Sequence, residues 1–164
     1  MVTRIATEKD IDLLVQLRID YLLDQNTLES LGNMEVLKDS LQAYFTPSFA
    51  KNEFMAIIAE DENTVYSTAF LSIADRPPRT SNEPSRIGTV YNVYTYPQFR
   101  KQGIATNVMK ALLDEAKNLD ICAVDLYASS DGKPLYEKLG FKIPFHTYMK
   151  IKTWQKGTKW CPFW

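Results

Sequence analysis

The amino-acid sequence predicts an α/β fold in which helices cover both faces of a mixed, mostly antiparallel sheet. Short β-branched and aromatic runs alternate with segments of helical periodicity, in the order β-α-α-β-β-β-α-β-α-β-β. Two neighbouring strand-like runs meet at a short polar turn, which favours an antiparallel hairpin. A strand, a helix and a strand follow one another between Ile87 and Ala128, which predicts one parallel pair of strands.

The first segments predict one strand and two helices. Thr7 and Asp10 have the spacing of a capping box, a pattern that starts helices. Apolar residues then recur over a wide face up to about Asp24, so we expect this helix to be covered on two sides. A second helix is expected to end before Pro47, which lacks the N–H that a helix interior needs. The predicted bounds are Val2–Ala6 for the strand, and Thr7–Asp24 and Met34–Phe45 for the helices.

The middle of the chain predicts a hairpin followed by a long loop. Two apolar and β-branched runs, Glu53–Glu60 and Thr64–Ala74, flank a turn signal at Asp61–Asn63. The next segment, Asp75–Arg86, contains three prolines and no residue of the hydrophobic set, so we expect an exposed loop. Loops of about 12 residues or more in compact domains are often functional.

The second half of the chain predicts the remaining elements. These are strands at Ile87–Tyr96 and Ile121–Ala128, helices at Gly103–Lys117 and Lys133–Leu139, and two closing strands at Phe141–Phe145 and Thr147–Lys152. Residues 1–152 are expected to form a single domain. The remaining tail, 153–164, contains all three tryptophans, Trp154, Trp160 and Trp164. We expect this aromatic tail either to pack on the domain or to form a contact in a homodimer.

The composition excludes several classes of partner. The chain has 45% hydrophobic and 24% charged residues and a net charge of −1, which gives no reason to expect nucleic acid or an anionic membrane as a partner, because both need a basic surface. Its longest apolar run, Phe54–Ala59, is far shorter than the ~20 residues that span a bilayer. The N-terminus lacks the apolar core of a secretory signal, so we expect a cytoplasmic protein. Cys122 and Cys161 are too few for a disulfide framework or a metal site, so we expect reduced thiols and no metal.

The stretch NVYTYPQFRKQGIATNVMKALLDEAK, Asn92–Lys117, changes from a strand pattern to a helix pattern across the segment RKQG. The N–H groups of a first helical turn have no partner within the helix, and the helix dipole adds positive potential there. Gly103 and Ala105 would let a ligand approach the backbone closely, and Arg100 and Lys101 add positive charge. The segment therefore predicts an anion site, unless Gly103 is simply tolerated at a helix start and the basic pair is a solvated turn.

Two motifs in this order resemble the GNAT N-acetyltransferase superfamily. The first is VYTYPQFRKQGIA, with the pattern V-x-x-x-P-x-x-R-x-x-G-x-A, and the second is ASSDGKPLYEKLGF. The N-terminal segment RIATEKDIDLLVQLR is also similar to the first strand and helix of that family. The resemblance covers nearly the whole domain, and it implies a GNAT-like fold and the use of acetyl-CoA as co-substrate.

The resemblance also implies roles for individual residues. The backbone of Val93, Tyr94 and Thr95 would pair with the pantetheine arm like an added strand. The Tyr94 N–H would stabilise the oxyanion. Tyr136 would be the general acid that protonates the departing thiolate, unless it only packs and lines the cofactor slot. Ser129, with Ser130 beside it, stands where many members have an asparagine that contacts the cofactor. The diphosphate would be held by Arg100, Lys101, Gln102, Gly103, Ile104, Ala105 and Thr106.

The function implied by the resemblance is transfer of the acetyl group of acetyl-CoA to a primary amine, by direct attack in a ternary complex. A small-molecule amine is the expected acceptor, and a protein N-terminus or lysine is the alternative within the same chemistry. A non-catalytic acyl-CoA sensor is the alternative from another class. The sequence contains no Ser-His-Asp or Cys-His pattern, in agreement with a reaction that needs no enzyme nucleophile.

Several polar residues remain open at this stage. The general base is unassigned, because the strand position that carries a glutamate in some members is Val124 here, and the neighbouring Asp125 should face the other way. Acidic residues at the end of the first helix would favour a cationic acceptor, whereas arginines in the long loop would favour an anionic one. The remaining candidates are Glu83, Tyr91 and Asn92 for the base, Asp20 and Asp24 for the acidic pair, Arg76, Arg79 and Arg86 for the loop, and His146 as a structural or acceptor-site residue.

Overall fold

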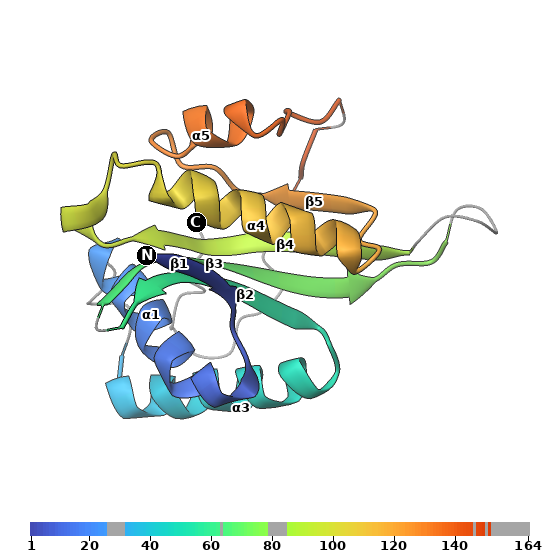
Figure 1. Ribbon diagram of the computed structural model, residues 1–164. Coiled ribbons are helices and arrows are strands. Elements are labelled where there is room, and N and C mark those ends of the chain that lie inside the picture. The colour runs from blue at the N-terminus through green and yellow to red at the C-terminus, as the bar shows by residue number, and fades with distance from the viewer. Residues whose placement is uncertain (26–31, 63, 79–84, 146, 150, 152–164) are drawn as a thin grey trace.

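The computed structural model describes residues 1–25, 32–62, 64–78, 85–145, 147–149 and 151. Five strands form one sheet in the order β1-β2-β3-β4-β5 (Figure 1). The strands are β1 (Val2–Ile5), β2 (Phe54–Asp61), β3 (Thr64–Asp75), β4 (Arg86–Thr95) and β5 (Ala123–Leu126). The helices are α1 (Ile11–Asp24), α3 (Met34–Ala50), α4 (Ile104–Asn118) and α5 (Lys133–Lys138), and two short 3-10 turns are η1 (Glu8–Asp10) and η2 (Pro97–Phe99).

The pairing of the strands confirms the predicted fold class. Strands β1 to β4 are antiparallel to their neighbours, and β5 runs parallel to β4. Because α4 connects β4 to β5, the carboxyl ends of both strands and the start of α4 lie at the same edge of the sheet (Figure 1). The predicted hairpin, the predicted parallel pair and the two helices before the hairpin are all present.

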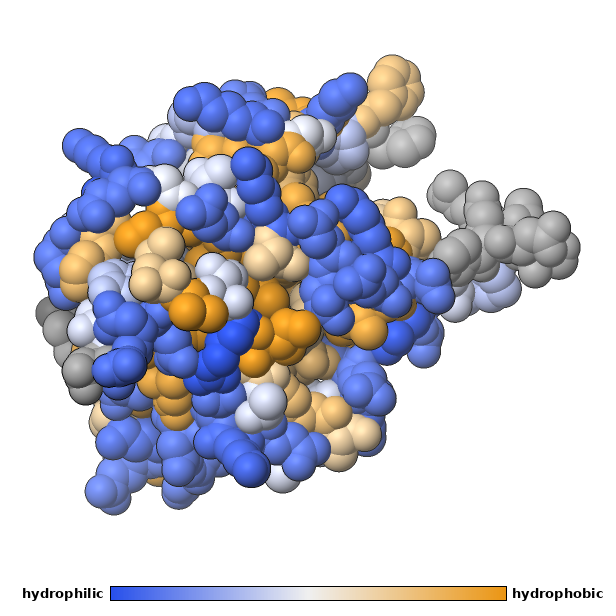
Figure 2. Space-filling view, in the orientation of Figure 1, coloured by the Kyte–Doolittle hydropathy of each residue, from blue (hydrophilic) through white to orange (hydrophobic). Residues whose placement is uncertain are grey.

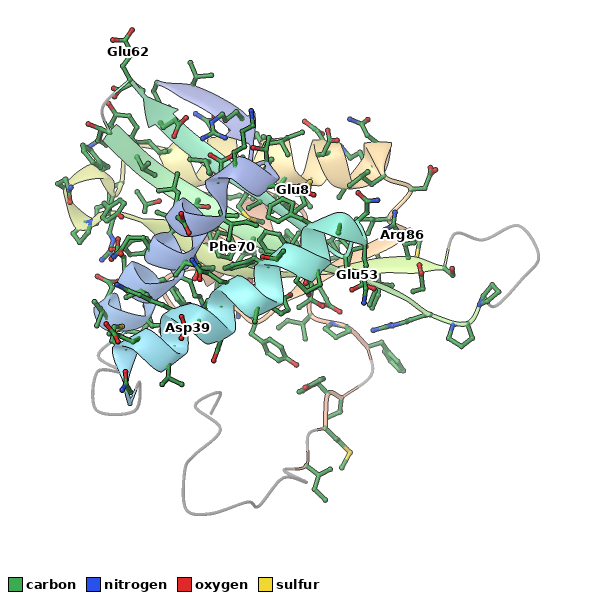
Figure 3. All side chains as sticks on the ribbon, turned by 90° about the horizontal axis from the view of Figure 1, so that it is seen from below. Glu8, Asp39, Glu53, Glu62, Phe70 and Arg86 are labelled. Carbon is green, nitrogen blue, oxygen red and sulfur yellow. The ribbon has the colours of Figure 1, made fainter. Side chains whose placement is uncertain are left out.

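The core consists of two apolar layers, one on each face of the sheet. Alternate residues of β2 face opposite sides, so Met55, Ile57 and Ala59 pack with α4, whereas Phe54, Ala56 and Ile58 pack with α1 and α3. Figure 3 shows Phe70 of β3 on the side of α1 and α3, where its ring lies edge-on to that of Phe45, 5.8 Å away. Burial on both faces explains why the β2 sequence is an unbroken apolar run.

The face of the molecule in Figure 2 carries many hydrophilic side chains, with apolar side chains exposed between them. None of the helices in the described part of the chain is long and apolar enough to cross a membrane.

An ion-pair cluster fixes the start of α1 against the sheet edge. The Thr7 N–H donates to Asp10 Oδ2 over 2.7 Å, which confirms the capping box. Arg4 Nη2 lies 2.8 Å from Asp10 Oδ1, and Arg4 Nε lies 2.6 Å from Glu60 Oε1 on β2. The hydrogen bond from Arg4 lowers the pKa of Asp10 from 3.8 to about 2. Strand β1, helix α1 and strand β2 are thus joined by charged groups.

This cluster predicts a pH-dependent contribution to stability. The pKa of Asp10 is lower in the folded chain than its ordinary value, so its contribution is complete above pH 3.8 and is lost as the pH falls towards 2. We expect about 1–2 kcal/mol, because Arg4 is partly exposed and solvent screens the pair. Urea unfolding of Arg4→Met should show lower stability at pH 7 and a smaller loss between pH 4 and 2. The exposed Lys117–Asp114 pair supplies the control, since Lys117→Met should change little. Parallel pH curves for Arg4→Met and the parent chain would contradict the assignment.

The prediction that Pro47 ends the second helix was wrong, because α3 continues to Ala50. Pro47 lies inside α3 and cannot donate to the carbonyl one turn back, so the helix loses one hydrogen bond there but continues for three more residues. The hydroxyls of Thr46 and Ser48 donate to the carbonyls one turn back, Gln42 O at 2.9 Å and Tyr44 O at 2.7 Å. Packing of Phe49 on Phe54, with ring centroids 5.1 Å apart, holds the last turn against the sheet.

The closing strands differ from the prediction. Residues 141–145, 147–149 and 151 are not in strands, and the rest of the second predicted strand lies outside the described residues. Pro144 stands inside the first predicted strand and cannot donate a hydrogen bond to a ladder. Ile143 and Phe145 are 81% and 98% exposed instead of facing the sheet. The aromatic tail, 153–164, also lies outside the described residues.

Candidate active site

The site is built around a β-bulge in β4. Asn92 has a φ of 52°, in the left-handed region, and the pairing register between β3 and β4 shifts between Thr68 and Phe70. The bulge changes the alternation of the strand. Tyr91 and Asn92, although consecutive, both contact the α1 and α3 side, whereas Val93 packs with the α4 layer.

Strands β4 and β5 separate immediately before this bulge. Their parallel register covers Ile87–Val90 and Ala123–Leu126 and goes no further within the described chain. The edge of β4 from Tyr91 to Thr95 is therefore not paired with β5, and its main chain can accept an extended ligand there. This is the segment, Val93 to Thr95, for which the sequence predicted contacts with pantetheine.

The loop from β4 to α4 ends in a turn with two left-handed residues. Lys101 and Gly103 have φ values of 61° and 79°. The first helical hydrogen bond of α4 runs from the Asn107 N–H to Gly103 O, 3.2 Å. Within the described part of the chain, the N–H groups of residues 101–106 donate to no other residue. These donors, together with the positive end of the α4 dipole, suit a diphosphate.

Arg100 connects this loop to the end of α1. Its Nε donates to Thr95 O over 2.9 Å, and its Nη2 lies 2.7 Å from Asp24 Oδ2. The guanidinium also lies over the ring of Tyr94, 5.9 Å from the ring centre. The Arg100 side chain thus ties the C-terminal end of β4 to the C-terminal end of α1. Lys101 and Gln102 are exposed on the same loop.

Tyr136 is a half-buried residue of α5 that packs on the α4 layer of the core. Its ring lies edge-on to that of Phe141, 5.9 Å away, and a Cβ at Gly132 would approach Tyr136 Cε2 to 2.9 Å. Burial raises the pKa of Tyr136 above 10.0, and the phenol of Tyr21 adds to the rise. The phenol is therefore protonated at neutral pH, as a proton donor must be.

Ser129 and Ser130 are exposed in the turn before α5. Ser129 Oγ accepts a hydrogen bond from the Gly132 N–H over 3.1 Å, and Ser129 O accepts one from the Lys133 N–H over 2.9 Å. Ser129 thus organises the turn that places Tyr136.

Sequence reasoning missed three residues on the α1 side of the site. Tyr21 lies edge-on to Tyr94, with ring centroids 6.2 Å apart, and Tyr96 donates its phenol hydrogen to Asp20. Arg18 is buried, and its guanidinium lies over the ring of Tyr21 and donates to Asn92 in the bulge. A polar residue at a position of α1 that faces the core, as Arg18 does, is a signal that could have drawn attention to this helix.

The polar residues that the sequence left without an assigned role lie in different parts of the structure. Asp20 and Asp24 are at the site, but they accept from Tyr96 and Arg100. Tyr91 donates to the Tyr44 phenol oxygen over 3.3 Å, and burial raises the pKa of Tyr91, so it is a poor base. As predicted, Val124 and Asp125 face different ways. Val124 packs on the α4 layer of the core, whereas the Asp125 carboxylate accepts a hydrogen bond from the Thr89 hydroxyl.

The arginines that anchor the long loop lie at the other end of β4. Arg86 begins β4 and donates to Asn52 O over 2.8 Å, and the Arg76 N–H donates to Ser85 O over 2.8 Å. Both residues are therefore separated from Val93–Thr95 by the length of the strand (Figure 1). Arg79, Glu83 and His146 lie outside the described residues. No group of His, Cys, Asp and Glu side chains with the geometry of a metal site occurs in the part of the chain that the structure covers.

Comparison with known proteins shows which family shares this architecture. The model of the acetyltransferase (GNAT) family matches residues 17–141. A predicted acetyltransferase from Clostridium acetobutylicum, whose crystal structure was solved with acetyl-CoA, is 34% identical, with a TM-score of 0.78 over 92% of this chain and 95% of that one. No curated protein matches the chain.

More distant structures share the fold. Glucosamine-6-phosphate N-acetyltransferase from Arabidopsis thaliana is 17% identical, with a TM-score of 0.63 over 95% of this chain and all of that one. The aminoglycoside 6'-N-acetyltransferase from Acinetobacter haemolyticus is also 17% identical, with a TM-score of 0.65 over 94% and 100%. Because the family model spans most of the chain, and includes the bulge, the α4 start and Tyr136, this protein belongs to the GNAT acetyltransferase family.

Proposed function

We propose that this protein is an N-acetyltransferase that transfers the acetyl group of acetyl-CoA to a primary amine of a small molecule. The observation that carries the proposal is the unpaired edge of β4 leading directly into the N–H groups of residues 101–106. Together they offer main-chain partners for an extended pantetheine arm and donors for a diphosphate. The 34% identical Clostridium protein, crystallised with acetyl-CoA, supports this choice of co-substrate.

Acetyl-CoA supplies an activated thioester, and the chain supplies position and charge. Ser67 Oγ on β3 donates to Tyr94 O over 2.8 Å and the Tyr96 N–H donates to Tyr66 O over 3.1 Å, so the Tyr94 N–H faces β3 and does not suit the oxyanion role that the sequence predicted for it. A main-chain N–H of the unpaired edge, from Val93 or Thr95, donates instead to the thioester carbonyl oxygen as that oxygen gains negative charge. The ammonium group of the acceptor first loses one proton to solvent, and the neutral amine nitrogen then forms a bond to the carbonyl carbon. The carbon–sulfur bond breaks, the nitrogen loses its second proton to solvent, and solvent later returns a proton to the Tyr136 phenolate. Tyr136 donates its phenol proton to the departing sulfur, which its raised pKa allows because the group stays protonated.

The acceptor is proposed to be cationic before it reacts. The rings of Tyr21, Tyr94 and Tyr96 lie together at the end of α1, beside the carboxylates of Asp20 and Asp24. Aromatic faces and carboxylates both attract an ammonium group. The anchoring arginines of the long loop lie at the opposite end of β4. Arg100 neutralises Asp24, so Asp20 and the aromatic rings carry the preference for a cation.

Two measurements test the function. Calorimetry should show that the protein binds acetyl-CoA, and an assay of free thiol should show release that depends on an amine from a panel of polyamines, aminosugars and peptides. Release with small amines supports the proposal, and release only with peptides would move the acceptor to proteins. Binding without release would identify an acyl-CoA sensor, and absence of binding would refute the proposal.

A further inference from the structure

A buried arginine lies directly behind the bulge of β4. Arg18 on α1 is only 8% exposed, and its guanidinium lies 5.5 Å from the ring centre of Tyr21 and 5.7 Å from that of Tyr91. Its Nη1 donates to Asn92 Oδ1 over 3.2 Å. Removing a guanidinium from water costs free energy. A buried arginine such as Arg18 therefore needs hydrogen-bond or aromatic partners that offset this cost.

Asn92 is the partner on the strand. It is 2% exposed, its side-chain amide accepts from Arg18, and its Nδ2 donates to Leu17 O at 3.5 Å. It also occupies the left-handed conformation, which glycine, asparagine and aspartate adopt more readily than other residues. One residue therefore both forms the bulge and links it to α1.

The bulge determines which way the following residues face. With the extra residue, Val93 packs towards α4 and the Tyr94 ring packs towards α1, edge-on to Tyr21. Without it, the alternation of the strand would reverse from Asn92 onwards. The main-chain groups that face the unpaired edge of β4 would then change as well.

We propose that Arg18 and Asn92 are positioning residues, a buried pair that ties α1 to the β4 bulge and so fixes the register of the unpaired β4 edge against which acetyl-CoA is proposed to lie. This inference rests on the proposed function. Neither side chain is proposed to touch the substrate. Tyr21, one turn after Arg18, extends the same connection to Tyr94 from the helix side.

The test separates the backbone conformation from the side-chain link. Asn92→Gly accepts the left-handed conformation but removes the amide, and Asn92→Asp keeps both the conformation and an acceptor for Arg18. We expect Asn92→Gly to lower kcat by about 10–100-fold, whereas Asn92→Asp should stay within about 5-fold of the parent enzyme. Acetyl-CoA affinity, measured by calorimetry, should change by less than about 3-fold in both variants, because the N–H groups of α4 are untouched.

A matched control accounts for a general loss of stability. Ser48 is 7% exposed and donates to Tyr44 O within α3, so Ser48→Ala also removes a buried hydrogen bond, away from the bulge. We expect Ser48→Ala to lower the melting temperature without changing kcat. Arg18→Lys, which keeps the charge but loses the planar fork, should lower kcat in the same direction as Asn92→Gly.

The outcomes distinguish the two proposals. An active parent enzyme with an Asn92→Gly variant of equal kcat overturns the positioning role alone. A loss of kcat in Asn92→Asp as large as in Asn92→Gly also overturns it, because the retained acceptor should rescue the link. A parent protein that binds no acetyl-CoA, or that releases no thiol with any amine, overturns the proposed function and the positioning role with it.

Discussion

Replacing Tyr136 with phenylalanine is expected to lower the turnover of acetyl transfer by about 10²–10⁴-fold, the usual contribution of a positioned general acid. The substitution removes only the phenol oxygen. The ring that packs on Phe141 and against Gly132 is retained, so the fold and the shape of the slot should be preserved. Acetyl-CoA affinity should therefore change little, and the loss should appear in kcat.

The pH dependence of the parent enzyme gives a second readout of Tyr136. Burial raises its pKa above 10.0, so the phenol remains protonated throughout the neutral range and beyond its ordinary value. Activity should not fall through ionisation of Tyr136 until the pH exceeds 10. Any decrease at lower pH belongs to other groups, and it should remain in the residual activity of the Tyr136→Phe enzyme.

Tyr66→Phe provides the matched control for the loss of one phenol oxygen. The Tyr66 phenol donates to Asp61 next to the β2–β3 turn, and Tyr66 lies on β3, a different strand from the bulge. Its kcat should equal that of the parent enzyme. Equal kcat for Tyr136→Phe would remove the acid assignment, and a matching loss of acetyl-CoA affinity would show that Tyr136 binds the co-substrate instead.

The sequence was most informative where local chemistry decides the structure. The change from strand to helix around Gly103, the capping box at Thr7 and the hairpin near Asp61 all depend on residues close together in the chain. The family resemblance rests on the same kind of short motif. These features predicted the order of the elements up to α5 and the position of the unpaired N–H groups.

The bulge could not be predicted in the same way. Asn92 stands in a run of β-branched and aromatic residues that fits a regular strand, and one extra residue leaves no mark on such a pattern. Its partner, Arg18, is 74 residues away in the chain, so their pairing depends on tertiary packing. Pro47 shows the same limit, since the packing of Phe49 on Phe54 outweighs a local signal that ends helices.

Replacing Gly103 with alanine is expected to weaken acetyl-CoA binding by about 10–100-fold while the protein stays folded. Gly103 has a φ of 79°, and a Cβ built there would meet no protein atom within 4 Å. The protein itself therefore leaves room for a methyl group, and the only internal cost is the left-handed conformation, about 1–2 kcal/mol. We expect the larger effect on binding because the methyl group would occupy space beside the N–H groups of residues 101–106.

Gly32→Ala isolates the effect of the ligand from the effect of strain. Gly32 has a φ of 66°, and a Cβ built there also has no atom of the described residues within 4 Å apart from its chain neighbours, but Gly32 precedes α3 instead of α4. Both variants should lose a similar part of their stability in urea, and only Gly103→Ala should lose affinity for coenzyme A in calorimetry. Equal affinities in the two variants would show that the diphosphate does not approach Gly103, and the start of α4 would then no longer support the proposed function.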